Sequence, residues 1–197
     1  ALLCLALSPL LLMSCDDDDN NGGSKLPEVK KLTEEMIKVR DYAPVDAVVG
    51  HRGTAFWAPE STEAAYRWAR EAGVDYLECD LQLSSDGIIV VVHDDNILDK
   101  TDVKDKFPEK GVEKNGKLLF YVKDFSLKEL RQLDAGSWFN NEDHKNEWRS
   151  SFANQKILTL EDVAMIAKGN RIVNYDSEGK ATYEADPEWN GNVPGLY

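Results

Sequence analysis

The sequence predicts an α/β fold in which parallel strands are connected by helices. Two short apolar runs, at residues 45–50 and 88–92, are rich in the β-branched residues that favour strands buried on both faces. Residues 62–72, between them, have helical periodicity, and residues 74–83 alternate like a strand. A helix between two such strands predicts a right-handed parallel crossover, which places functional side chains at the carboxyl ends of the strands.

The helix expected at residues 62–72 has both a start and a stop signal. Glu63 lies in its first turn, where a negative charge favours the helix dipole, and Gly73 follows its end. A stripe of mostly small apolar residues is predicted to face the sheet, and it comprises Ala64, Ala65, Trp68, Ala69 and Ala72.

The strand expected at residues 74–83 should present two carboxylates on one face. Its alternation places Glu78 and Asp80 together with Tyr76, and it places Cys79 on the opposite face with Leu77 and Leu81. Cys79 has two interpretations, a nucleophile or a small core residue. Its position opposite the carboxylates favours the core residue.

Two of the three histidines directly follow predicted strands. His51 follows the run at residues 45–50, with Arg52 next to it, and His93 follows the run at residues 88–92. These side chains and the carboxylates of Glu78 and Asp80 are therefore expected at the same edge of the sheet. Structure alone gives no reason to gather such groups there, so this edge is the candidate functional site.

The order of these motifs resembles the N-terminal half of the glycerophosphodiester phosphodiesterase family. The resemblance is carried by HRG, PEST, the helix, GVDYLECDLQLSSDG and VVVHD, in that order and spacing. It implies a TIM (β/α)8 barrel of the phospholipase C-like phosphodiesterase type. Such a barrel needs about 250 residues, so this chain is expected to be truncated at its C-terminal side, with a third strand beginning at residues 193–197.

The resemblance also implies a role for each charged residue. His51 and His93 would be the acid–base pair, and Arg52 would bind the substrate phosphate. Glu78 and Asp80 would bind a divalent cation, with Glu60 beside or just behind it. A third carboxylate ligand is expected beyond Tyr197. The family more often has PENT where this chain has PEST, so Ser61 is a departure.

These residue types suit hydrolysis of a phosphodiester. The substrate is an anion with a poor leaving group, so a carboxylate-bound cation, Ca²⁺ or Mg²⁺, would neutralise charge while histidines transfer protons. The expected reaction converts glycerophosphodiesters to sn-glycerol 3-phosphate and an alcohol. The alternatives are a phospholipase D-like enzyme acting on lysolipids or sphingolipids, and an inactive surface lipoprotein that binds phosphorylated ligands. The fragment itself is expected to be inactive.

The N-terminal residues predict export and a lipid anchor. Residues 1–15 form an apolar leader that ends in LMSC, which resembles a lipobox with Cys15 as the lipidated residue. Residues 16–25 read as an acidic flexible tether, and residues 26–197 as the incomplete barrel domain. The expected location is the bacterial cell envelope, at the outer membrane, facing the periplasm or the surface. The net charge of −13 argues against nucleic acid as a partner.

An insertion is expected at about residues 99–156. Within it, Lys100 stands where the family usually has arginine, and Ser126 and Glu129 have capping-box spacing. Trp138 and Phe139 have two interpretations, substrate contact or core. Asp94, just before the insertion, is expected to orient His93, whereas His144 within it reads as part of a solvated loop.

The remaining signals are local. Thr159 and Asp162 form a second capping box before an apolar helix that Gly169 follows. Residues 172–191 read as a loop or a hairpin insertion.

Overall fold

The computed structural model describes residues 33–34, 46–141 and 152–197. Ala1–Tyr42 and Ala43–Tyr197 form separate units, and the elements from β1 to β10 lie in the second unit. The predicted leader, the predicted lipidation site Cys15 and the loop residue His144 lie outside the described residues. No helix within the described ranges is long and apolar enough to cross a membrane.

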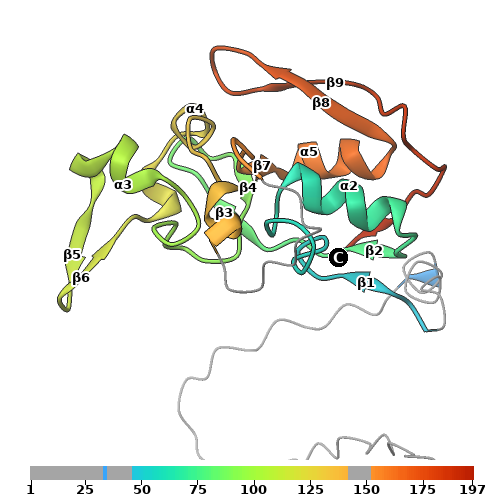
Figure 1. Ribbon diagram of the computed structural model, residues 1–197, viewed down its shortest axis with the longest axis horizontal. Coiled ribbons are helices and arrows are strands. Elements are labelled where there is room, and N and C mark those ends of the chain that lie inside the picture. The colour runs from blue at the N-terminus through green and yellow to red at the C-terminus, as the bar shows by residue number, and fades with distance from the viewer. Residues whose placement is uncertain (1–32, 35–45, 142–151) are drawn as a thin grey trace, which may run out of the picture. The chain divides into compact units, whose positions relative to one another are not determined.

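A parallel sheet forms the base of the second unit (Figure 1). Its strand order is β1-β2-β10, and both pairings are parallel. The strands are short, with β1 at Val49–Gly50, β2 at Tyr76–Leu77 and β10 at Gly195–Leu196. The strand predicted at residues 193–197 is therefore confirmed, and it lies on the other side of β2 from β1. The predicted parallel crossover between the first two strands is also confirmed.

The crossover helix α2, Glu63–Glu71, begins and ends where the sequence indicates. Thr62 caps its first turn, and Gly73 has the left-handed backbone conformation, with φ +81°. The predicted buried stripe is only partly correct, because Trp68 is 52% exposed. Its ring lies 5.9 Å from that of Trp57 instead, and Tyr66 and Arg70 are buried with the predicted Ala65 and Ala69.

The prediction of one strand over residues 74–83 is wrong. The chain leaves β2 after Leu77, and a separate strand, β3, spans Leu81–Leu83. The three residues between them bond to three different partners: Glu78 N–H donates to Gly50, Cys79 N–H to Tyr197, and the Asp80 carbonyl accepts from Val92. Residues 78–80 therefore form the junction between the parallel sheet and a second, antiparallel sheet.

The run at residues 88–92 forms a strand, but the predicted parallel environment is wrong. β4, Ile89–Val91, is antiparallel to β3 on one side and to β7, Leu158–Thr159, on the other. Gly87 adopts φ +80° in the turn between β3 and β4, so a tight hairpin replaces the crossover that a parallel strand would need. Val90 and Val91 are buried, whereas Ile89 is 44% exposed.

The region after β4 has a hydrophobic core of its own. The predicted capping box of Ser126 and Glu129 is present at the start of α4. Among the described residues, eleven buried ones form this core, including Ile97, Phe120, Phe125 and Leu130. The elements around it are α3 Val103–Lys106, η1 Pro108–Lys110, β5 Val112–Lys114, β6 Lys117–Leu119, η2 Val122–Asp124, α4 Leu127–Leu130 and η3 Ser137–Asn141.

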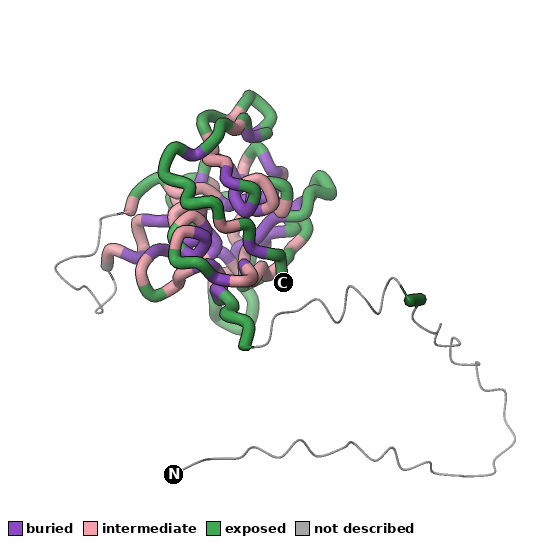
Figure 2. Tube along the Cα trace, turned by 90° about the vertical axis from the view of Figure 1, so that its right-hand side faces the viewer, coloured by how far each residue is buried: buried purple, intermediate pink, exposed green. Residues whose placement is uncertain are grey.

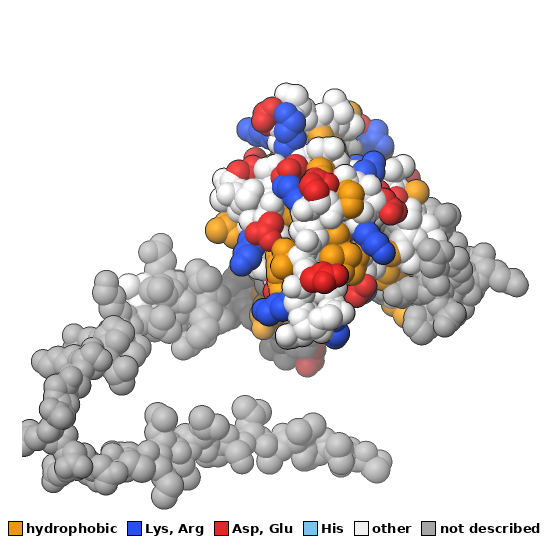
Figure 3. All heavy atoms as spheres, turned by 90° about the vertical axis from the view of Figure 1, so that its left-hand side faces the viewer, with side chains coloured by type: hydrophobic (Ala, Val, Ile, Leu, Met, Phe, Trp, Pro, Cys, Tyr) orange, Lys and Arg blue, Asp and Glu red, His pale blue; other side chains and the backbone are white. Residues whose placement is uncertain are grey.

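A second core lies between the helices and the parallel sheet. α5, Leu160–Ala167, begins with the predicted capping box of Thr159 and Asp162 and lies beside α2 (Figure 1). Tyr66, Leu77 and Ile166 are completely buried between them. Figure 2 shows buried residues at the centre of the unit and exposed residues around it. On the face in Figure 3, basic and acidic side chains lie interspersed.

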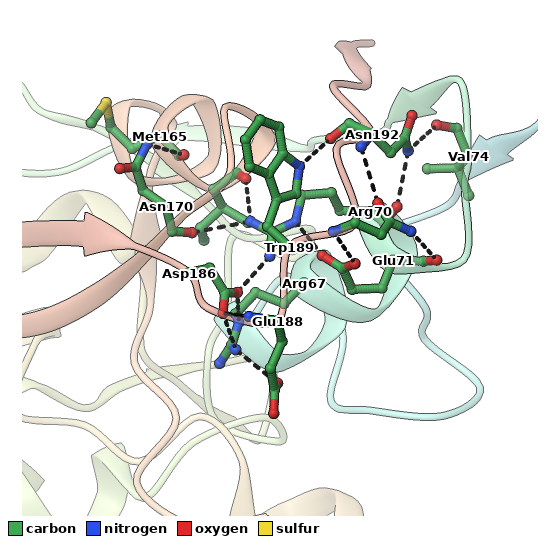
Figure 4. A network of polar contacts seen from close by, with 12 residues as sticks. Arg67, Arg70, Glu71, Val74, Met165, Asn170, Asp186, Glu188, Trp189 and Asn192 are labelled. Carbon is green, nitrogen blue, oxygen red and sulfur yellow. Dashed lines mark hydrogen bonds and ion pairs between the residues drawn. The ribbon is translucent and has the colours of Figure 1, made fainter.

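Residues 172–191 read from the sequence as a loop or a hairpin insertion, and the structure has a hairpin there. β8, Asn170–Tyr175, pairs antiparallel with β9, Ala181–Ala185. The segment that follows β9 is attached to α2 by a network of polar contacts (Figure 4). Asp186 accepts hydrogen bonds from both Arg67 and Arg70, and Asn192 donates to the carbonyls of Arg70 and Val74. This network fixes the chain just before it enters β10.

Candidate functional site

The loop after β1 carries the first group of candidate residues. Gly50 ends the strand, and Arg52 adopts the left-handed conformation with φ 52°. Gly53 follows with φ +85°, and a Cβ at this position would lie 2.7 Å from the backbone of Ala65 in α2. Only glycine fits this contact, so the HRG sequence produces a tight turn against the helix.

Arg52 lies among the three carboxylates that the sequence proposes as cation ligands. We call Glu60, Glu78 and Asp80 the carboxylate cluster. The guanidinium donates to Glu60 Oε1 over 3.1 Å, and its Nε lies 3.4 Å from Asp80 Oδ2. The Arg52 backbone N–H donates to Glu78 Oε2 over 2.7 Å. The structure therefore brings together four of the predicted site residues, with three carboxylates around Arg52.

The positions of these carboxylates follow from the sheet junction. Glu78 comes directly after β2, and Asp80 comes directly before β3, so both stand where the chain passes from one sheet to the other. Tyr66 of α2 supports this junction, because its hydroxyl donates to the Glu78 carbonyl over 3.0 Å. Glu60 reaches the same place from the loop before α2.

Lys100 contributes a second cation beside Glu60. Its ammonium lies 3.5 Å from Glu60 Oε2 and 3.7 Å from the centre of the Trp138 ring. Lys100 and Trp138 line one pocket together with Glu60 and His93. Trp138 thus lies at the candidate site, whereas Phe139 is buried. The sequence signalled Lys100 only as a replacement for arginine and gave no indication of its contact with Trp138.

The two predicted catalytic histidines are arranged differently. His93 Nδ1 lies 2.8 Å from Asp94 Oδ1, which agrees with the expected orienting role of that carboxylate. His51 is exposed, and among the described residues it makes no hydrogen bond or ion pair. No hydrogen bond links the described side chains of His51 and His93. Both follow strand ends, β1 for His51 and β4 for His93.

The carboxylate cluster has the donor chemistry of a site for a hard cation. Carboxylate oxygens are the ligands that Ca²⁺ and Mg²⁺ prefer. Asp80 Oδ2 is buried and has no hydrogen-bond partner, which leaves one oxygen available to a ligand. Within the described parts of the chain, no three acidic, histidine or cysteine side chains are gathered closely enough to hold a metal ion. Arg52 lies among the carboxylates instead.

Cys79 lies between the two carboxylates in sequence but packs against the buried core. Burial of its thiol raises its pKa to about 11, and the neighbouring Glu78 and Asp80 charges also raise it. The thiol is therefore protonated near neutral pH. Because a thiolate is the nucleophilic form, the structure favours the interpretation of Cys79 as a core residue.

The fold and the site define the class of the protein. It is an α/β protein in which basic and acidic side chains meet at the carboxyl ends of parallel strands. Residues 51–193 match the model of the glycerophosphoryl diester phosphodiesterase family. The chain belongs to this family.

Relatives with known names agree with this assignment. A glycerophosphodiester phosphodiesterase from Bacillus subtilis is 35% identical over 133 residues, which cover 68% of this chain and 39% of the relative. A glycerophosphoinositol inositolphosphodiesterase from Mus musculus is 38% identical over 104 residues, covering 53% of this chain and 18% of the relative. The chain thus spans about two-fifths or less of the length of these relatives.

Solved structures of family proteins also match. A family protein from Silicibacter pomeroyi is 22% identical, with a TM-score of 0.50. The matched region covers 64% of this chain and 43% of the Silicibacter chain. This match supports the α/β fold. An Oleispira antarctica phosphodiesterase, solved with the product sn-glycerol-3-phosphate, is 31% identical, with a TM-score of 0.47. The matched region covers 64% of this chain and 41% of the Oleispira chain.

Proposed function

We propose that the protein hydrolyses glycerophosphodiesters to sn-glycerol 3-phosphate and an alcohol. Family membership and the 35% identity to the Bacillus subtilis relative support this reaction. The observation that carries it is the placement of Arg52 among the carboxylate cluster, at the end of the parallel sheet. A phosphodiester needs both a cationic fork for its oxygens and anionic ligands for a cation, and this edge holds both.

Each residue of the site has a proposed role. The carboxylate cluster would hold Ca²⁺ or Mg²⁺, with a further carboxylate expected beyond Tyr197. When bound, the cation supplies positive charge that stabilises the phosphoryl oxygens. Arg52 would bind two phosphate oxygens with its planar guanidinium. His51 and His93 would exchange protons with the attacking and leaving oxygens, and Asp94 would hold the ring of His93 in one orientation.

We propose that β1, β2 and β10 are the first strands of a (β/α)8 barrel of the phospholipase C-like type. The parallel order of the three strands and the α2 crossover support this. The matched proteins are more than twice as long as the matched region, which leaves room for the remaining strands. We propose the complete site, and therefore the activity, for the whole protein.

The proposed reaction is tested on the full-length protein expressed without residues 1–15. We expect glycerophosphocholine to yield sn-glycerol 3-phosphate with Ca²⁺ or Mg²⁺, and no turnover with EDTA. Replacing either histidine with alanine should lower kcat by roughly 10²- to 10⁴-fold, since general acid–base catalysis contributes that much. Glu78→Ala should lose both turnover and cation binding.

Glu184→Gln serves as the control, because Glu184 lies on the exposed hairpin β8–β9. This variant should keep the activity of the unmodified protein. A folded, cation-binding protein that hydrolyses none of several glycerophosphodiesters would contradict the proposal. Hydrolysis of lysophosphatidylcholine or sphingomyelin vesicles in their place would favour the phospholipase D-like alternative, and binding of phosphorylated ligands without turnover would favour a binding lipoprotein.

We also propose that Cys15 carries a lipid that anchors the protein in the bacterial cell envelope, at the outer membrane. This rests on the LMSC sequence and the acidic tether after it. Mass spectrometry of the N-terminal peptide should find a diacylated Cys15, and Cys15→Ser should release the protein from the membrane fraction. An unmodified Cys15 in the mature protein would contradict the anchor without affecting the proposed reaction.

A further inference from the structure

Arg52 has a combination of contacts that phosphate binding alone does not require. Here the guanidinium lies between Glu60 and Asp80, and the side chain is only 18% exposed. Its positive charge therefore offsets negative charge in the carboxylate cluster, where repulsion would otherwise push the side chains apart.

The backbone of Arg52 is held independently of its side chain. Its N–H donates to Glu78, and its carbonyl accepts a 3.0 Å hydrogen bond from the Ser61 N–H. The guanidinium is held less firmly. Its Nε lies 3.4 Å from Asp80 Oδ2, yet both of these buried atoms lack a hydrogen-bond partner. The side chain can therefore leave Asp80 without breaking a well-formed hydrogen bond there.

We propose that Arg52 is an internal counter-ion, which holds the carboxylate cluster in place and competes with a divalent cation for it. This inference rests on the cation site of the proposed function. Arg52 and a cation would both draw on the charge of Glu60 and Asp80, so the guanidinium must withdraw from at least one of them. Withdrawal leaves its donors available for a phosphate, which makes Arg52 a positioning residue before it becomes a phosphate ligand.

Lys100 supports the same arrangement. It lies 3.5 Å from the second oxygen of Glu60, so Glu60 remains partly neutralised when Arg52 withdraws. Asp80 has no such second cation among the described side chains. The competition should therefore be strongest at Asp80, whose buried Oδ2 is the oxygen without a hydrogen bond.

Calorimetric titration with Ca²⁺ alone, on the full-length protein, tests the inference. Arg52→Gln should bind Ca²⁺ roughly three- to tenfold more tightly than the unmodified protein, since a competing charge of modest strength is removed. Arg52→Lys keeps the charge and should bind within about twofold of the unmodified protein. Arg171→Gln, which removes the same charge from the exposed hairpin, should leave the affinity unchanged.

Thermal unfolding gives a second measurement. Without a cation, Arg52→Gln should unfold at a lower temperature than the unmodified protein, and Ca²⁺ should raise its unfolding temperature by a larger amount. Equal or weaker Ca²⁺ affinity in Arg52→Gln, with normal binding by the unmodified protein, overturns the counter-ion role and leaves the proposed function intact. Absence of Ca²⁺ or Mg²⁺ binding in every variant overturns both.

Discussion

Arg52 and Arg70 both lie among carboxylates, but their surroundings differ in exposure and in hydrogen bonding. The Arg70 side chain is completely buried, and its donors reach Glu71, Asp186 and the carbonyls of Ile166 and Asn170. The Arg52 side chain is 18% exposed, and its Nε has no hydrogen bond. Every guanidinium nitrogen of Arg70 has a partner, whereas around Arg52 a buried donor and a buried acceptor remain unmatched.

Of the two arginines, Arg70 is the one whose contacts stabilise the fold. Arg70 connects α2 to the residues after β9, and a fully paired buried charge has no capacity left for a ligand (Figure 4). Arg52 connects groups on a loop and a sheet junction, where unmatched polar atoms lie at the carboxyl ends of the strands. Guanidinium and carboxylate groups therefore stabilise the fold around Arg70, and around Arg52 they include unmatched atoms that fit the proposed binding site.

The largest effect on stability is expected at Asp186. Asp186→Ala removes the buried carboxylate partner of Arg70, since both side chains have 0% exposure. The carboxylate that remains, Glu71, is 28% exposed and contacts only Nε. Breaking a buried pair by removing one partner costs about 3–5 kcal/mol, so the free energy of unfolding in urea should fall by this order. Arg67 also loses a partner, but it is 26% exposed and can be solvated.

The matched comparison is Glu60→Ala at the other arginine. Glu60 is 15% exposed, and its partner Arg52 keeps a contact with Asp80. We expect a loss of about 1 kcal/mol or less, as for partly exposed ion pairs. Similar losses for Asp186→Ala and Glu60→Ala would show that the two clusters do not differ as their burial indicates.

Acidification should separate the clusters further. Burial raises the pKa of Asp186, but hydrogen bonds from Arg67 and Arg70 lower it by more, so its pKa lies below the usual value of 3.8. A carboxyl with a lowered pKa in the folded state stabilises the fold above its unfolded pKa, and this stabilisation is lost as the pH falls through the folded pKa. The stability difference between the unmodified protein and Asp186→Asn should therefore shrink below about pH 4. A difference that stays constant from pH 6 to pH 2.5 would contradict this assignment.

Local signals were enough to predict some elements but not others. Glu63 and Gly73 mark the two ends of α2 within a few residues, so the sequence predicts that helix correctly. The antiparallel pairing of β4 depends on the turn at Gly87 and on β7, which lies far along the chain. Apolar composition alone does not distinguish a parallel from an antiparallel strand, and this is why that prediction failed.

The candidate site shows the same division. The motifs indicated which residues carry charge at strand ends, and the structure gathers Arg52 with the carboxylate cluster. The burial of Arg70 could not be predicted, because arginine is rarely buried completely and its partner Asp186 is 116 residues away. The periodicity of a helix can place an arginine on the buried face. It gives no local signal of the distant carboxylate that neutralises the charge of that arginine.

The smallest effect is expected at the hairpin pair of Arg171 and Glu184. Both side chains are more than 40% exposed, although Arg171 donates directly to Glu184. Water and salt screen such a pair, and holding two long side chains together costs conformational entropy. Glu184→Ala should therefore leave the urea midpoint unchanged within error at 0.15 M salt. A loss of unfolding free energy as large as that for Asp186→Ala would mean that direct ion pairing, and not burial, sets the contribution of each cluster to stability. The contrast between Arg52 and Arg70 would then need a different cause.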